Sequence, residues 1–173
     1  MEPKPASAST TLISHWMGVT DANSSGNIHG GIIMKLADEA AGIAAIKHSG
    51  QQVVTVGMDR MAFLVPIYVG EVVTFRATVN AAWRSSMEVG VRVDAEDPLT
   101  GVRRHTNTAF LTMVALDPDG RPAAVPGLAA STPDEQRRMR EAELRRANRL
   151  AERAEIIARR GVEDAAATPG LPL

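Results

Sequence analysis

Residues 23–42 read NSSGNIHGGIIMKLADEAAG, and this stretch decides how the rest of the sequence is interpreted. The Asn, Ser and Gly residues at its start favour a loop. From Gly30 to about His48, apolar residues recur at helical spacing on nearly every side, which predicts a buried helix. Two adjacent acids, Asp38 and Glu39, interrupt that helix. Because burying an unpaired carboxylate is costly, an acid at this place requires an explanation.

The period of the apolar pattern changes after this helix. Four segments rich in Val and Thr follow, each bounded by turn residues, and they predict four consecutive strands within 53–65, 71–84, 86–97 and 103–117. A shorter apolar run at 10–19 is a further candidate strand. A long helix followed by consecutive strands predicts an α+β fold, with an antiparallel sheet wrapped around the helix.

The two ends of the chain differ from this central part. Residues 1–10 are predicted to be a disordered leader, residues 11–128 the folded domain, and residues 161–173 a flexible tail. Residues 133–160 are predicted to form a charged helix with nine arginines and six acids, which Thr132 or Asp134 would cap. Its apolar stripe is too thin to stabilise a lone helix, so we expect a solvated helix that packs on the body or on a neighbouring subunit. The stripe consists of Leu144, Ala147, Leu150, Ala154 and Ile157.

Composition excludes several classes of function. The chain has 173 residues, no cysteine and a net charge of −1, so disulfides, thiol nucleophiles and thiolate metal sites are excluded. The four histidines are not at metal-ligand spacing, and no metal is expected. The near-zero charge gives no case for binding to nucleic acid or a membrane, and the arginine-rich helix has no aromatic residue for base stacking. Without a secretory signal or an apolar run of membrane-spanning length, a cytoplasmic location is expected.

The start of the central helix suggests one kind of chemistry. Gly30 and Gly31 permit close approach of a ligand to helical N–H groups that have no intrahelical partner. Asp38 lies seven residues beyond Gly31 and returns to the same face. An acid that activates water and an N–H group that holds an oxyanion would support acyl-transfer hydrolysis. A tight loop-to-helix junction explains the two glycines equally well, and spacing alone does not choose between Asp38 and Glu39.

Four segments of the sequence resemble one family. DANSSGNIHGGIIMKLADEAAG, VVTVGMDRMAFLVPIYVGEVV, RSSMEVGVRVDAED and TAFLTMVALDPDGRP are similar to the hotdog-fold acyl-CoA thioesterases, particularly the brain-type cytosolic enzymes and their bacterial relatives. The resemblance covers about residues 12–128. It implies a curled antiparallel sheet around a long central helix, and pairing of two units into a double-hotdog dimer, commonly within a hexameric trimer of dimers. It also implies hydrolysis of fatty acyl-CoA to fatty acid and CoA without a cofactor, coenzyme A being part of the substrate and product.

The resemblance assigns catalytic roles to three residues. Asp38 matches the catalytic acid of the family, acting on water as general base or as nucleophile through a mixed anhydride. Asn23 matches the asparagine of the preceding loop, which would come from the facing subunit, although Asn27 in the same loop is an alternative. Gly31 matches the position whose N–H polarises the thioester carbonyl, and His29 and Gly30 would shape that loop.

Further residues would bind the substrate. Arg84, Ser85 and Ser86 match a turn that lies near the CoA moiety in relatives, although a plain hairpin turn is the alternative. Thr55 and Met58, after the helix, would line the acyl tunnel or pack in the core. The chain contains one hotdog unit where the animal enzymes fuse two, so a homo-oligomer would restore the geometry.

Two other functions are compatible with this fold. One is a non-catalytic protein that binds or senses acyl-CoA, because a fold can be reused without its chemistry. A buried acid beside a thioester argues against this alternative. The other is a hotdog dehydratase, which would be expected to carry a histidine paired with Asp38; no histidine occupies a neighbouring helical position.

Overall fold

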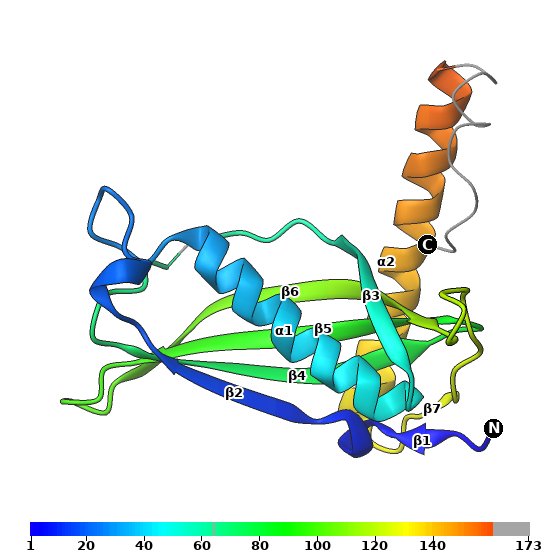
Figure 1. Ribbon diagram of the computed structural model, residues 1–173, viewed down its shortest axis with the longest axis horizontal. Helices are drawn as coiled ribbons and strands as arrows, with labels where there is room; N and C mark the ends of the chain where they lie inside the picture. The colour runs from blue at the N-terminus through cyan, green and yellow to red at the C-terminus, as the bar shows by residue number, and fades with distance from the viewer. Residues whose placement is uncertain (64, 161–173) are drawn as a thin grey trace.

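The computed structural model describes residues 1–63 and 65–160 (Figure 1). The predicted flexible tail, 161–173, lies outside the described residues. In chain order the elements are β1 (Lys4–Pro5), the short 3-10 helix η1 (Ala6–Ser9), β2 (Thr11–Trp16), a second 3-10 helix η2 (Val19–Asp21), α1 (Gly30–Ser49), β3 (Gln52–Met58), β4 (Val72–Ala82), β5 (Ser86–Glu96), β6 (Arg103–Leu116), β7 (Leu128–Ala129) and α2 (Pro133–Arg160).

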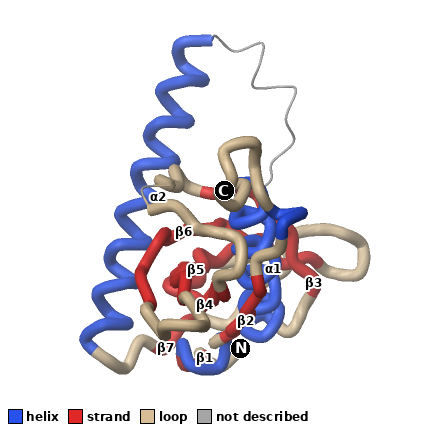
Figure 2. Tube along the Cα trace, turned by 90° about the vertical axis from the view of Figure 1, so that its left-hand side faces the viewer, coloured by secondary structure: helices blue, strands red, loops and turns tan. Residues whose placement is uncertain are grey.

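A curled antiparallel sheet of five strands forms the body, in the order β2-β4-β5-β6-β3. Its inward side chains alternate with outward ones, as in Met87, Val89, Val91, Val93 and Ala95 of β5, all of them fully buried. Figure 2 shows the sheet between the two helices, with α1 against its concave side and α2 outside. β2 and β3 are the edge strands, so β3 pairs with β6 on one side alone. The predicted hotdog-type arrangement of helix and sheet is confirmed.

The central helix α1 is defined at both ends by its caps. At the start, the Nδ1 atom of His29 accepts a hydrogen bond from the Gly31 N–H at 3.0 Å. At the end, Gly50 adopts the left-handed conformation (φ 71°) and donates its N–H to the Ile46 carbonyl. The face against the sheet is made of small side chains, which let the helix approach the strands closely: Ala37, Ala40, Ala41, Ala44 and Ala45.

The opposite face of α1 is open in the single chain. Met34, Ile43 and Ile46 on this face are 41, 42 and 47% exposed. The expectation of a helix buried on nearly every side is therefore wrong for one chain. An exposed apolar face of this kind indicates an association surface, which periodicity does not distinguish from a core.

The N-terminal residues belong to the fold. β1 pairs in parallel with β7. Ser9 is completely buried, and its hydroxyl accepts the Val79 N–H at 3.0 Å while it donates to the Ala6 carbonyl. The prediction that residues 1–10 are a disordered leader is therefore wrong. Hydrogen bonds to the neighbouring strands hold this segment, and its small Ala and Ser side chains leave room for them.

The charged helix α2 lies across the outer face of the sheet and is attached through arginines. Arg145 binds Glu88 of β5, Arg149 binds Asp59, and the Arg146 guanidinium stacks over Trp83 at 4.4 Å from the ring centroid. Leu144 and Leu150 of the predicted apolar stripe are exposed instead. Within one chain the stripe therefore does not contact the sheet, whose outer surface is polar, and packing of the stripe on a neighbouring subunit stays a prediction.

Candidate active site

Asp38 lies on the open face of α1 beside Thr55 of β3. The Thr55 hydroxyl donates a hydrogen bond to Asp38 Oδ1 at 2.6 Å, which fixes the orientation of the carboxylate. The two residues line a shallow depression of about 400 Å³, walled by apolar side chains that include Ile43 and Met113. The sequence predicts that Thr55 lines the acyl tunnel or packs in the core; in the structure its hydroxyl contacts the candidate catalytic acid directly.

The neighbouring acid, Glu39, has a different environment. It is exposed and forms an i,i+4 ion pair with Lys35 at 3.6 Å. Asp38, by contrast, is half-buried, and its carboxylate accepts the Thr55 hydroxyl; both acids line the depression on α1. The structure therefore favours Asp38 over Glu39 as the reactive group, and leaves it accessible in the single chain rather than buried.

The loop before α1 positions Asn23. Asn23 Oδ1 accepts the N–H groups of Ser25 at 2.9 Å and Asn27 at 3.3 Å, and the Asn23 N–H donates to the Asn27 carbonyl. The side-chain oxygen is thus used within the loop, and the amide NH₂ group (Nδ2) of Asn23 is left to donate to a ligand. Asn27 faces the same pocket, so the choice between the two asparagines stays open.

A second pocket of about 380 Å³ adjoins this loop. Asn23, Gly30 and Phe63 line it, whereas Asp38 and Thr55 line the depression on α1. Among the described residues, the two linings have no member in common. One chain therefore places the acid and the amide donors in two separate pockets.

The glycines at the helix start differ in the availability of their N–H groups. The Gly31 N–H is already bound to His29 Nδ1. The Gly30 N–H has no acceptor in residues 1–63 and 65–160, and Gly30 lines the second pocket. The geometry thus favours Gly30 over the predicted Gly31 as the donor to a carbonyl oxygen, with His29 acting as the cap that leaves Gly30 free.

One polar residue of this pocket, Asn107, is not among the site residues predicted from the sequence. Asn107 of β6 is buried; its Nδ2 donates to the Ala62 carbonyl, while its Oδ1 is a buried atom without a partner in the described chain. The inward positions that follow it on β6, Ala109, Leu111 and Met113, are apolar, and an asparagine at the start of that series is the signal that could have pointed to it. Asn107 lines the second pocket, and its buried, unpaired oxygen is the kind of exception that calls for a hydrogen-bond donor nearby.

An ion pair holds the wall of the second pocket. Arg104 donates to both oxygens of Glu71, at 2.5 and 2.7 Å, and to the Pro66 carbonyl. Burial raises the pKa of Glu71, but hydrogen bonds from Arg104 and from the Tyr68 N–H outweigh it and hold that pKa below its usual value. The Ile67 carbonyl in turn accepts the Ile28 N–H at 2.8 Å, which ties this segment to the Asn23 loop.

The remaining predicted binding residues lie elsewhere. Arg84 is exposed on the turn between β4 and β5, but Ser85 and Ser86 are buried, and the Ser86 hydroxyl accepts a hydrogen bond from Arg146. Of the three, Arg84 alone is accessible to a ligand. Met58 is half-buried and packs against the core.

The described residues form neither a metal site nor a membrane-spanning helix. No group of three or more His, Cys, Asp or Glu side chains is arranged to hold a metal ion. None of the described helices has the length and apolar character needed to cross a membrane.

Comparison with known proteins identifies the family. Residues 25–102 match the model of the thioesterase superfamily. The cytosolic acyl coenzyme A thioester hydrolase of Rattus norvegicus is 38% identical over 143 residues, which are 81% of this chain and 37% of the relative. A hexameric acyl-CoA thioesterase structure, solved without ligand, is 36% identical with a TM-score of 0.86, and the match covers 89% of this chain and 99% of that one. The chain belongs to the hotdog acyl-CoA thioesterase family.

A ligand-bound member of the family is also similar. The acyl-CoA hydrolase of Staphylococcus aureus, solved with butyryl coenzyme A and coenzyme A, is 36% identical with a TM-score of 0.82, over 88% of this chain and 93% of that one. That enzyme has also been characterised as variants with an aspartate, a threonine or an asparagine replaced by alanine. The present chain spans just over a third of the length of the rat relative.

Proposed function

We propose that this thioesterase-family chain hydrolyses fatty acyl-CoA to a fatty acid and CoA. The observation that supports the proposal most directly is the 2.6 Å hydrogen bond from Thr55 to Asp38, on a helix face that one chain leaves open. An oriented carboxylate next to an apolar depression suits activation of water beside an acyl chain. Aspartate, threonine and asparagine are also the residue types altered in the variants of the S. aureus enzyme.

In the proposed mechanism, Asp38 removes a proton from water while the water oxygen attacks the thioester carbonyl carbon. Because Thr55 occupies Oδ1, Oδ2 is the oxygen that faces the water. The Gly30 N–H and the positive end of the α1 dipole stabilise the oxyanion. The amide NH₂ group of Asn23 orients the water. As the carbon–sulfur bond breaks, the proton held by Asp38 passes to the departing sulfur. The alternative is attack by Asp38 itself, which forms a mixed anhydride. Transfer of ¹⁸O from labelled water into the Asp38 carboxylate during a single turnover would reveal that route.

As half-sites of one active site, the two pockets require a second copy of the chain. The exposed apolar face of α1 and the free edge of β3 lie on the same side of the molecule as Asp38. We propose that a second chain covers this side as a double hotdog, which brings its Asn23 pocket to the Asp38 depression, and that three dimers form a hexamer like the structural neighbour. The proposed cytoplasmic location agrees with the name of the cytosolic rat relative.

Complementation between two inactive variants tests this arrangement. Asp38→Asn and Asn23→Ala each damage a different half-site, so a mixed dimer regains one intact site of two. Random pairing of equal amounts should restore about one quarter of the wild-type thiol-release rate, because half of the dimers are mixed.

The matched control uses two variants of the same half-site. Asp38→Asn mixed with Thr55→Val should show no gain beyond the sum of the separate activities. No recovery in the first mixture, with subunit exchange verified by mass, would exclude a shared site. Binding of acyl-CoA without thiol release by the wild type at any chain length would instead identify the non-catalytic binding protein.

A further inference from the structure

Gly42 is the one glycine of α1 that lies in the middle of the helix. Gly30 and Gly31 belong to its first turn, and Gly50 is its C-cap. In a helix interior, glycine is less favourable than alanine because it loses more backbone entropy on folding. A Cβ atom added at Gly42 would lie 3.9 Å from Met113 Cε, an ordinary contact, and would meet no other heavy atom of the described residues within 4 Å apart from α1 itself. Packing within one chain therefore leaves room for alanine, and the glycine needs another reason.

Gly42 faces the same depression as Asp38. Side chains four residues apart lie one above the other on a helix, so Asp38, Gly42 and Ile46 form one row, and all three line the depression. Gly42 is half-buried, and Ile46 is exposed. The row extends over about 12 Å of helix. The bare backbone at Gly42 thus lies one turn away from the acid, in the middle of the depression.

The depression is apolar beyond its two acids and Thr55. Met113 is buried beneath it, with Sδ 3.4 Å from the Thr55 hydroxyl and Cε directed to Gly42. Methionine is flexible and fills irregular space, so this floor adapts to what lies on it. A thioester whose carbonyl carbon is held at Asp38 therefore has an apolar surface beside it for its chain. That surface is formed by Gly42 and by the side chains of Ile13, Ile43, Ile46, Val53 and Met113.

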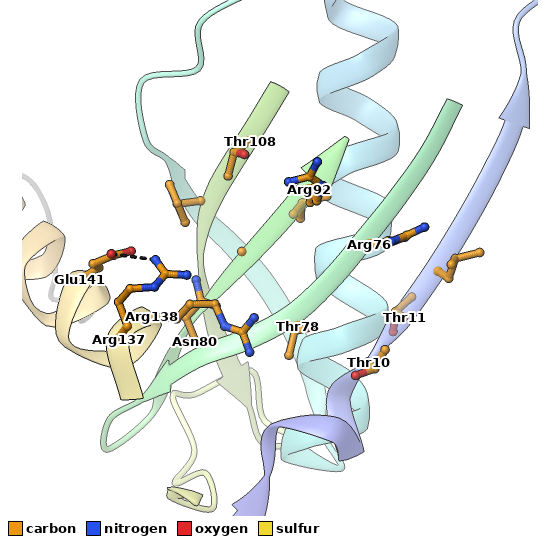
Figure 3. Close-up of a pocket in the computed structure, with 14 residues that line it drawn as sticks. Thr10, Thr11, Arg76, Thr78, Asn80, Arg92, Thr108, Arg137, Arg138 and Glu141 are labelled. Carbon is orange, nitrogen blue, oxygen red and sulfur yellow. Dashed lines mark hydrogen bonds and ion pairs between the residues drawn. The ribbon is translucent and has the colours of Figure 1, made fainter. Parts of the chain in front are cut away.

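The large pocket on the outer face of the sheet does not offer such a surface to the chain. It has a volume of about 530 Å³, and four arginines line it: Arg76, Arg92, Arg137 and Arg138. Figure 3 shows this pocket in front of the strands with α1 behind them, and Figure 2 shows α1 on the concave side. The sheet therefore separates the outer pocket from Asp38, and the chain has the α1 depression as its neighbouring apolar surface.

We propose that Gly42 selects the acyl-chain length that the enzyme accepts. The chain lies along the row from Asp38 to Ile46 and crosses the bare backbone at Gly42. An acetyl group ends before it reaches Gly42, about 6 Å of helix from the acid, whereas a long chain has to pass over it. A larger side chain at this position would fill the space above Met113 and stop the long chain. This inference rests on the proposed hydrolysis of acyl-CoA and names the residue that discriminates among its substrates.

Thiol release from acetyl-CoA and palmitoyl-CoA by the full-length protein tests the proposal. In Gly42→Leu, the ratio of kcat/KM for palmitoyl-CoA to kcat/KM for acetyl-CoA should fall about tenfold or more, the discrimination that a small change of volume produces in an apolar site. Gly42→Ala should lower the ratio less, because one carbon fits above Met113. Ala151→Leu places the same side chain on an exposed position of α2 and should leave the ratio unchanged.

Binding of non-hydrolysable thioether analogues of the same two substrates, measured by calorimetry, separates this proposal from the proposed hydrolysis. A wild type that releases no thiol refutes hydrolysis, but a loss in Gly42→Leu confined to the palmitoyl analogue would still support the role of Gly42. Equal palmitoyl-to-acetyl ratios in the wild type and Gly42→Leu overturn the proposal. An altered oligomer mass with an unchanged ratio also overturns it, since the bare backbone would then make room for a second subunit. If Gly42→Leu does not fold, Gly42→Ala, which favours the helix, decides by the same ratios.

Discussion

Replacement of Arg145 by Met should destabilise the protein through the buried carboxylate that it leaves behind. Glu88 is completely buried, and Arg145 contacts it with Nε at 3.2 and 3.1 Å and with Nη2 at 2.7 Å. The same guanidinium lies 3.6 Å from the centroid of the Phe110 ring. Without Arg145, Glu88 keeps the Asn80 amide at 3.3 Å and Arg149 at 3.5 Å.

The size of the effect follows from these contacts. Removing one partner of a buried ion pair costs about 3–5 kcal/mol. The remaining partners of Glu88 place Arg145→Met at the lower end, about 3 kcal/mol, which corresponds to a fall in Tm of roughly 6–12 °C for a chain of this size. Replacing both charges, as Glu88→Leu with Arg145→Leu, should recover much of the loss because the buried carboxylate is removed together with its main partner, while Arg149 keeps its ion pair with Asp59.

Urea unfolding at one fixed protein concentration measures the difference in the free energy of unfolding. Arg159→Met is the matched control, since Arg159 forms an i,i+4 pair with Glu155 near the end of the same helix and both side chains are exposed. It should change stability by at most about 0.5 kcal/mol. Equal and small losses for Arg145→Met and Arg159→Met would refute the reasoning, as would a double replacement less stable than the single one.

Three further predictions concern catalysis, pH dependence and packing. Thr55→Val should lower kcat about 10- to 100-fold with little change in KM, because a hydrogen bond to charged Asp38 is worth about 1.5–3 kcal/mol, whereas Thr55→Ser should retain most activity in a thiol-release assay. Burial lowers the pKa of His48, so its contribution to stability is present above its usual pKa of 6.5 and is lost as the pH falls below it; His48→Gln should flatten thermal stability between about pH 7 and 5. Gly90→Ala should reduce Tm by displacing the Asn80 amide, and retained Tm would show that the amide moves freely.

Much of the fold could be predicted because its signals are local. The helix predicted from Gly30 to about His48 is α1, and the long alternating segments became β4, β5 and β6 almost residue for residue. The prediction for residues 1–10 failed. Residues 4–9 are fixed by hydrogen bonds, such as Ser9 with Val79, and the contacts of α2 with the sheet are ion pairs, neither of which a hydrophobic pattern reveals.

The candidate site could be predicted only in part. Sequence identified Asp38 and Asn23 through the family motif, but spacing gave no choice between Asp38 and Glu39 without the resemblance. The bond from Thr55 to Asp38 depends on how β3 lies against α1, and the unpaired oxygen of Asn107 depends on the loop that ends near it. Such contacts join residues far apart in the chain and leave no trace in a local pattern.

The free edge of β3 makes a newly synthesised copy of this protein prone to associate with other chains. Unpaired backbone groups and exposed apolar side chains of this kind are a template for pairing with other chains unless they are covered, as they would be in the dimer proposed above. The irregularity between Thr55 and Gly57 shortens the regular part of that edge and so limits wrong pairings. Partnering is also a matter of mass action: each tenfold rise in subunit concentration favours the paired state by about 1.4 kcal/mol. The concentration of the protein in the cell would therefore determine the fraction of chains that are paired and so protected from aggregation.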